Sequence, residues 1–105
     1  LEVLRSLYDE GADVVILTGG TGLSKRDITV DSIMPLLDRE IKGFGELFRS
    51  ISHKKAGIPS FLSRALAGTL DDKIIFCLPG SPQAVELALD LILPELSHML
   101  YVIKS

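Results

Sequence analysis

The sequence predicts an α/β domain with helices packed on both faces of a mainly parallel sheet. Two apolar segments, 14–18 and 74–78, have no polar face and are each followed by a glycine-bearing loop. Segments with helical spacing of apolar residues alternate with them, which is typical of this fold class. With 105 residues, of which 47% are hydrophobic, the chain can form one small domain, 1–105, with its own core.

Composition and charge exclude several classes of function. A formal net charge of −3 argues against a nucleic-acid-binding surface, so any site for an anion has to be local. No apolar run approaches the roughly 18 residues that a membrane span requires. The single cysteine, Cys77, leaves no disulfide framework and indicates a reducing compartment, so we expect a cytoplasmic protein.

The first half of the chain is predicted to alternate between helix and strand. Residues 1–10 have a helical stripe, and residues 14–18 read as a buried parallel strand. A helix is predicted over 31–41, with Pro35 near its first turn. After a break at two glycines, helix is expected to resume from Glu46.

The second half is predicted to contain a strand pair and a long helix. Residues 58–68 read as a short helical piece that ends at a glycine. Residues 69–78 read as a strand, a turn at two aspartates and a second, buried strand. A helix is predicted over 82–96, because a serine at the N-cap and a proline at the first helical position precede an apolar stripe.

The loop after the first strand, TGGTGLSKRDIT, has the composition of an anion site. Its glycines allow successive N–H groups to point at one anion, and its threonine and serine hydroxyls add donors. Lys25 and Arg26 add positive charge. Asp27 would repel a phosphate unless a cation such as Mg²⁺ lies between them. The loop therefore indicates a magnesium-nucleotide or a phosphorylated small molecule.

The second loop, LPGSP, also carries a strand end through a glycine and a hydroxyl into a helix. Ligands of α/β sheets bind outside the carboxyl ends of the strands, so we expect both loops at one edge. The structural alternative is that each loop is only a turn. In that case the charged residues of the first loop form a solvent-exposed ion pair that adds little to stability. Neither the P-loop nor the dinucleotide-binding pattern is present.

Four motifs in order, TGGTG…RDIT, DREIKGFGELFR, LSRALAG and LPGSP, resemble the MoaB/Mog family of molybdenum-cofactor biosynthesis proteins. The resemblance implies a three-layer α/β/α sandwich that forms a trimer or a dimer of trimers. It implies an adenylyltransferase that moves AMP from Mg-ATP to the molybdopterin phosphate and releases pyrophosphate. It also implies that strands and a second metal-binding aspartate precede this chain, which would be the C-terminal two-thirds of the domain.

The resemblance assigns roles to particular residues. Asp27 is expected to hold Mg²⁺ and to act in catalysis, with ATP as a substrate and no tightly bound prosthetic group. The residues expected to bind phosphate, pterin or nucleotide are Thr18, Gly19, Gly20, Thr21, Gly22, Glu40, Ser52, Ser63, Arg64, Pro79, Gly80 and Ser81.

Structural roles for some of these residues stay open. Glu40 could form a surface pair with Arg39, Ser52 could cap a helix, and Arg64 could pair with an acidic residue at a subunit interface.

Other functions stay open as well. Related domains of the MoeA insertase and CinA types usually differ after the paired glycines, so the Thr-Gly and Arg-Asp pairs here favour MoaB/Mog. A non-catalytic, pterin-binding or scaffold trimer is the remaining alternative.

Overall fold

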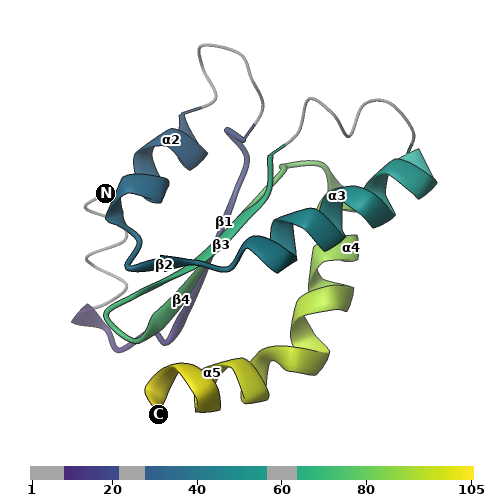
Figure 1. Cartoon of the computed structure of the whole chain (residues 1–105). Coiled ribbons are helices and arrows are strands. Elements are labelled where there is room, and N and C mark those ends of the chain that lie inside the picture. The colour runs from purple at the N-terminus through teal and green to yellow at the C-terminus, as the bar shows by residue number, and fades with distance from the viewer. Residues whose placement is uncertain (1–8, 22–27, 57–63) are drawn as a thin grey trace.

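The computed structural model describes residues 9–21, 28–56 and 64–105, in which four strands form one sheet (Figure 1). The spatial order of the strands is β1-β4-β3-β2. Their bounds are β1 Val14–Thr18, β2 Arg39–Glu40, β3 Leu66–Leu70 and β4 Lys73–Leu78.

The sheet is mixed, whereas the sequence predicts a mainly parallel one. β1 runs parallel to β4, with Thr18 opposite Leu78, but β3 is antiparallel to both β4 and β2. The reason lies in the two-residue turn between β3 and β4. Asp71 and Asp72 both have positive φ, 53° and 62°, which is the conformation of a tight hairpin turn.

Helices cover both faces of the sheet, so the predicted three-layer arrangement is confirmed (Figure 1). Among the described residues, the short helix α2 covers one face, and three helices cover the other. The described helices are α2 Thr29–Ile33, α3 Lys42–Ala56, α4 Pro82–Ile92 and α5 Leu96–Lys104, with 3₁₀ turns at Met34–Leu36 and Leu93–Glu95.

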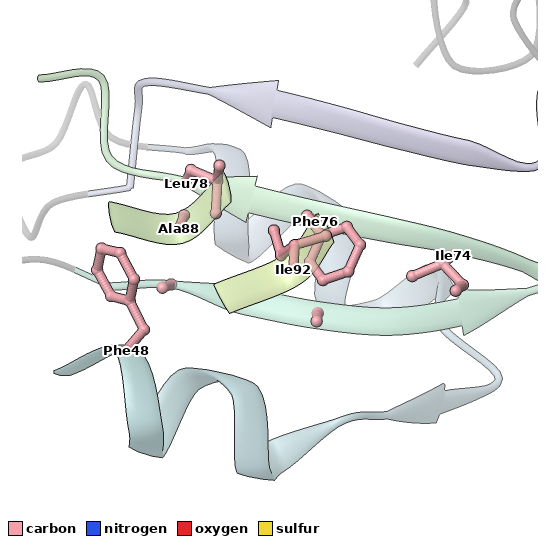
Figure 2. Packing of buried hydrophobic residues seen from close by; sticks show 8 residues of the cluster. Phe48, Ile74, Phe76, Leu78, Ala88 and Ile92 are labelled. Carbon is pink, nitrogen blue, oxygen red and sulfur yellow. The ribbon is translucent and has the colours of Figure 1, made fainter. Parts of the chain in front are cut away.

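Strand β4 supplies the centre of the core because both of its faces are buried. Ile74, Phe76 and Leu78 point to the layer of α3 and α4, where Phe48, Ala88 and Ile92 surround them (Figure 2). Ile75 and Cys77 point to the opposite layer and pack with Val30 and Ile33 of α2. The continuous apolar run in the sequence thus marks a strand between two helix layers.

The helix predicted over 31–41 is shorter than expected. α2 begins at Thr29, passes into a 3₁₀ turn at Met34, and gives way to extended backbone at Leu37. The chain then pairs with β3, since the Asp38 amide donates to the Thr69 carbonyl at 2.7 Å. Pro35 has no backbone N–H to continue the helix. The pairing with β3 then provides the hydrogen bonds that a longer helix would have formed within itself.

Two further boundaries differ from the prediction for a tertiary reason. α3 begins at Lys42 rather than Glu46 and includes both glycines of GFGE. A Cβ on Gly45 would lie 2.8 Å from the Ala65 carbonyl oxygen, so the missing side chain allows α3 to approach the sheet closely. Residues 66–68 are strand and not helix, because Gly68 pairs with both β2 and β4.

The first strand is less buried than the sequence predicts. β1 is an edge strand of the described sheet, and 39% of the Ile16 side chain is exposed. At the start of β1, the Asp13 carboxylate accepts a hydrogen bond from Lys104 Nζ at 2.8 Å, which ties the end of α5 to the sheet. No helix in the described part of the chain is long and apolar enough to span a membrane.

Cys77 is expected to be inert in the native protein. Its side chain is 0% exposed, and burial raises the pKa of its thiol to about 11, so almost no thiolate is present at neutral pH. We expect a thiol reagent to label native protein far more slowly than protein unfolded in guanidinium, which is the control. Equally fast labelling in both states would show that the buried position of β4 is wrong.

Candidate functional site

The two glycine-bearing loops meet at one edge of the sheet, as the sequence predicts. They leave the carboxyl ends of the neighbouring parallel strands β1 and β4, where Thr18 lies opposite Leu78. The Gly19 amide donates to the Leu78 carbonyl at 2.8 Å and so extends the pairing of the two strands by one bond. A Cβ added to Gly80 would lie 3.3 Å from Gly19 Cα, so the loops are in contact.

The carbonyl groups of the first loop are held by the protein itself. Thr29 clamps two of them: its hydroxyl donates to the Gly19 carbonyl at 2.9 Å, and its amide donates to the Gly20 carbonyl at 2.9 Å. The Thr21 carbonyl accepts hydrogen bonds from the Arg64 amide at 3.0 Å and from Arg64 Nε at 3.1 Å. Three consecutive carbonyls therefore have internal donors.

This arrangement directs two N–H groups of the loop. In a trans peptide the C=O of one residue and the N–H of the next point in opposite directions. Because the carbonyls of Gly19 and Gly20 face Thr29, the amides of Gly20 and Thr21 point away from it. No hydrogen bond from either amide to another described residue is found. Of the two, the Gly20 amide belongs to the more accessible residue, which is half-buried, and it can face an anion.

Two details of the predicted anion site need correction. The Gly19 amide was expected to face the anion, but it belongs to the strand pairing with Leu78. The Thr21 hydroxyl was expected to act as a donor to a ligand, but Thr21 is only 3% exposed. This exposure is that of the whole residue, so the Thr21 amide is no more open to a ligand than its hydroxyl.

Arg64 forms an ion pair within the chain. Its Nη1 donates to Asp31 Oδ1 at 2.8 Å and its Nη2 to Oδ2 at 3.3 Å, in the two-pronged geometry that suits a guanidinium and a carboxylate. The hydrogen bond from Arg64 lowers the pKa of Asp31 below its ordinary value of 3.8. Asp31 lies in the first turn of α2, so Arg64 links this helix to the first loop.

The second loop ends at a helix cap. Ser81 has extended backbone, and its hydroxyl accepts a hydrogen bond from the Ala84 amide at 3.2 Å, which confirms the predicted N-cap of α4. Pro82 occupies the first turn of the helix. The hydroxyl hydrogen of Ser81 can still donate to a ligand. Gly80 and Ser81 are exposed, and Pro79 is half-buried.

Glu40 is not brought to the two loops within this chain. It lies on β2, opposite Gly68, and the register places it level with Val15, back along the sheet from the loop edge. Glu40 is exposed there, on the far side of the sheet from β1. Its predicted contact with nucleotide is therefore not supported by the geometry of the described chain.

Ser52 lies in the second half of α3 and is half-buried. α3 starts beside β3, where the Ile41 amide donates to the Ala67 carbonyl, and then passes Ala65, whose carbonyl accepts a hydrogen bond from Arg49 at 3.4 Å. α3 thus runs toward the end of the sheet that carries the glycine loops. This direction is compatible with the predicted role of Ser52.

Three of the predicted residues, Gly22, Asp27 and Ser63, lie outside the described residues, so their roles stay predictions. Within the described ranges, no group of three His, Cys, Asp or Glu side chains could hold a metal ion. The predicted magnesium ligand is therefore argued from the sequence motif alone.

Sequence reasoning missed two residues that hold the site together, Thr29 and Asp31. Thr29 is the last residue of the RDIT motif and the first of α2, a place where side-chain and backbone donors commonly bind loop carbonyls. The partner of Asp31 is 33 residues away in the sequence, so no local pattern could have indicated this pair.

The fold and the loops define a class of protein, namely an α/β domain with two glycine-bearing loops in contact at the ends of neighbouring parallel strands. Residues 2–98 match a family model described as a probable molybdopterin binding domain. Molybdenum cofactor biosynthesis protein B of Staphylococcus aureus (strain MRSA252) is 54% identical over 100 residues, which cover 93% of this chain and 60% of that protein.

Solved structures agree with this result. A crystal structure of a molybdenum cofactor biosynthesis protein B has a TM-score of 0.91 at 48% identity, with 98% of this chain and 65% of the other covered. The tungsten cofactor synthesizing protein MoaB from Pyrococcus furiosus has a TM-score of 0.87 at 44% identity, with 99% and 69% covered. The chain belongs to the MoaB/Mog family of molybdenum-cofactor biosynthesis proteins. It spans 60% of the length of the curated relative.

Replacing Gly20 by alanine should destabilise the first loop more than the same change at Gly19. Gly20 has a φ of +66°, and a Cβ there would collide with the Thr29 hydroxyl. Gly19 has a φ of +88°, but its added Cβ would meet no atom within 4 Å. Gly19→Ala should therefore lose only the left-handed backbone cost of about 1–2 kcal/mol in the free energy of unfolding. Urea unfolding measures both variants.

A third variant separates the collision from the backbone cost. In the double variant Gly20→Ala/Thr29→Ala, the hydroxyl that the new methyl group would meet is absent. The losses of unfolding free energy in the single variants Gly20→Ala and Thr29→Ala should therefore sum to more than the loss in the double variant. Equal losses for Gly19→Ala and Gly20→Ala would contradict the close packing of Gly20 on Thr29.

Proposed function

We propose that this protein acts in molybdenum-cofactor biosynthesis, binds molybdopterin and Mg-ATP, and transfers AMP to the molybdopterin phosphate. The observation that carries the proposal is the contact between two glycine-bearing loops at the ends of the parallel strands β1 and β4. The family description as a molybdopterin binding domain and the naming of the S. aureus relative support the same pathway. The alternatives are a pterin-binding or scaffold protein without turnover.

The geometry suits a reaction that needs alignment more than proton transfer. An oxygen of the terminal molybdopterin phosphate attacks the α-phosphorus of ATP, a new P–O bond forms, and the bond to the β-phosphate breaks to release pyrophosphate. The nucleophile is already an anion, so the protein needs no general base and contributes positioning and charge neutralisation.

Two parts of the described chain can contribute these donors. In the first loop, the amide of the half-buried Gly20 can donate to a phosphate oxygen. Gly80 and Ser81 stand at the N-terminus of α4, which carries a partial positive charge and favours an anion nearby.

Magnesium, when bound, would neutralise phosphate oxygens with one or two carboxylates as ligands. In the described part of the site, the nearby carboxylate of Asp31 is paired with Arg64, and no cluster of metal ligands is formed. Asp27 of the RDIT motif is the proposed ligand.

Replacing Asp27 by asparagine should lower the rate of adenylyl transfer by roughly 10²–10³-fold, by analogy with the removal of one charge-stabilising group from an active site. The assay measures pyrophosphate release from Mg-ATP in the presence of molybdopterin, on the protein at its natural length. Molybdopterin binding should change much less. Asp90→Asn is the matched control, because Asp90 is an exposed aspartate on α4.

The same assay decides between the functions considered. Full activity of the Asp27→Asn variant would remove the metal role from that residue. A wild-type protein that binds molybdopterin but releases no pyrophosphate would support the binding or scaffold function instead.

A closed homo-oligomer, a trimer or hexamer, is part of the proposal. Large apolar side chains are exposed on the outer side of α5, where Tyr101 is 75% and Val102 is 56% accessible. A small domain gains buried apolar surface by association, and closed symmetric assemblies are common. We expect light scattering to give the mass of three or six chains at micromolar concentration. The mass of a single chain would contradict this part of the proposal.

A further inference from the structure

The peptide group between Gly19 and Gly20 is held in one orientation by a side chain of α2. The Thr29 hydroxyl donates to the Gly19 carbonyl at 2.9 Å, and it is the donor found for this carbonyl among the described residues. The Gly20 N–H belongs to the same peptide group, so it points to the opposite side. No acceptor for this N–H is found in the described part of the chain.

This peptide group has little else to fix its direction. To reverse it, the chain changes mainly ψ of the first residue and φ of the second, and here both residues are glycines. Gly19 and Gly20 have φ values of +88° and +66°, and glycine adopts positive and negative φ about equally readily. Both residues are half-buried, so tight packing does not hold them either. The bond from the Thr29 hydroxyl therefore selects the direction of the Gly20 N–H.

Thr29 is itself held firmly enough to act in this way. It is the first residue of α2, which is anchored in the core by the buried side chains of Val30 and Ile33. Its amide donates to the Gly20 carbonyl at 2.9 Å, and its β-branched side chain has few rotamers. A Cβ on Gly20 would collide with the Thr29 hydroxyl, so this hydroxyl packs directly against the loop.

We propose that Thr29 is a positioning residue for phosphate. Its hydroxyl holds the Gly19 carbonyl so that the Gly20 N–H stays directed at a phosphate oxygen of ATP or of molybdopterin. Thr29 acts through the peptide group and does not touch the substrate. The inference rests on the proposed adenylyl transfer and adds to it the side chain that aligns a phosphate-binding amide.

The variant Thr29→Val removes the hydroxyl, keeps the shape of the side chain, and leaves the backbone bond to the Gly20 carbonyl in place. The kcat of pyrophosphate release should fall about tenfold or more, because a misplacement of about 1 Å can reduce a rate by about 10²-fold. Thr29→Ser keeps the hydroxyl and should retain most of the activity. Thr69→Val is the matched control, since it removes a hydroxyl from a half-buried threonine at the opposite end of the sheet. Melting temperatures of all three variants record any change in stability.

The direction of the peptide group can be followed by NMR in the protein at its natural length. Gly19 and Gly20 form the only Gly-Gly pair in these 105 residues. Labelling glycine with ¹³C at the carbonyl and ¹⁵N at the amide therefore couples the two isotopes at this peptide alone among them. We expect the Gly20 resonance to shift when Mg-ATP or molybdopterin is added separately, and the ligand that shifts it identifies the source of the phosphate. Thr29→Ser should respond like the wild type, and Thr29→Val much less.

The outcomes separate this inference from the proposed function. A wild type that releases no pyrophosphate would overturn the function, and a ligand-induced Gly20 shift that Thr29→Val abolishes would still support the positioning role. A wild-type Gly20 resonance that responds to neither ligand would overturn the inference. So would an unchanged kcat in Thr29→Val, or an equal loss in Thr29→Ser. A loss of kcat that only follows the melting temperature, and occurs equally in Thr69→Val, would show that the hydroxyl is merely structural.

Discussion

The parallel pairing of β1 with β4 is the constraint on which the site depends. It places Thr18 opposite Leu78, so the loops that follow the two strands begin side by side. The bond from the Gly19 amide to the Leu78 carbonyl continues the backbone pairing of the two strands to the point where the loops begin. Without this register the two glycine-bearing loops would be separate turns, and neither would form one face of a shared site.

The pairing is stabilised by burial rather than by the polar groups at its end. β4 lies between two layers of helices, and its side chains from Ile74 to Leu78 are almost fully buried. Burial of a large apolar side chain contributes about 1.5–3 kcal/mol relative to exposure, whereas exposed ion pairs such as Asp31–Arg64 contribute little to stability. The core therefore holds the strands in register, and the polar contacts determine the conformation of the loops.

The first loop shows how backbone carbonyls can orient a potential binding site. Thr29 donates to the Gly19 and Gly20 carbonyls, and the trans peptide geometry then directs the amides of Gly20 and Thr21 the other way. Arg64 donates to the next carbonyl, that of Thr21. This division of the backbone into a held side and a donor side requires glycine at position 20, where a side chain would collide with Thr29. The local sequence and the distant Arg64 thus act on the same few peptide groups.

The sequence alone was sufficient for features with a local physical cause. The apolar run 74–78 predicted a strand buried on both faces, Ser81 and Pro82 predicted the start of α4, and the glycine loops predicted a common edge. Four ordered motifs also led to the correct family, because each reflects a loop whose backbone needs those residue types.

Only the tertiary structure decided the features that depend on distant partners. Residues 39–40 and 66–68 have no strong strand pattern, and they are strands because each completes the hydrogen bonds of a neighbour. The assignment of the Gly19 amide to strand pairing, and the union of Asp31 with Arg64 across 33 residues, follow from the packing of the whole chain. Local propensity cannot encode such contacts, since the free energy that selects them comes from groups elsewhere in the sequence.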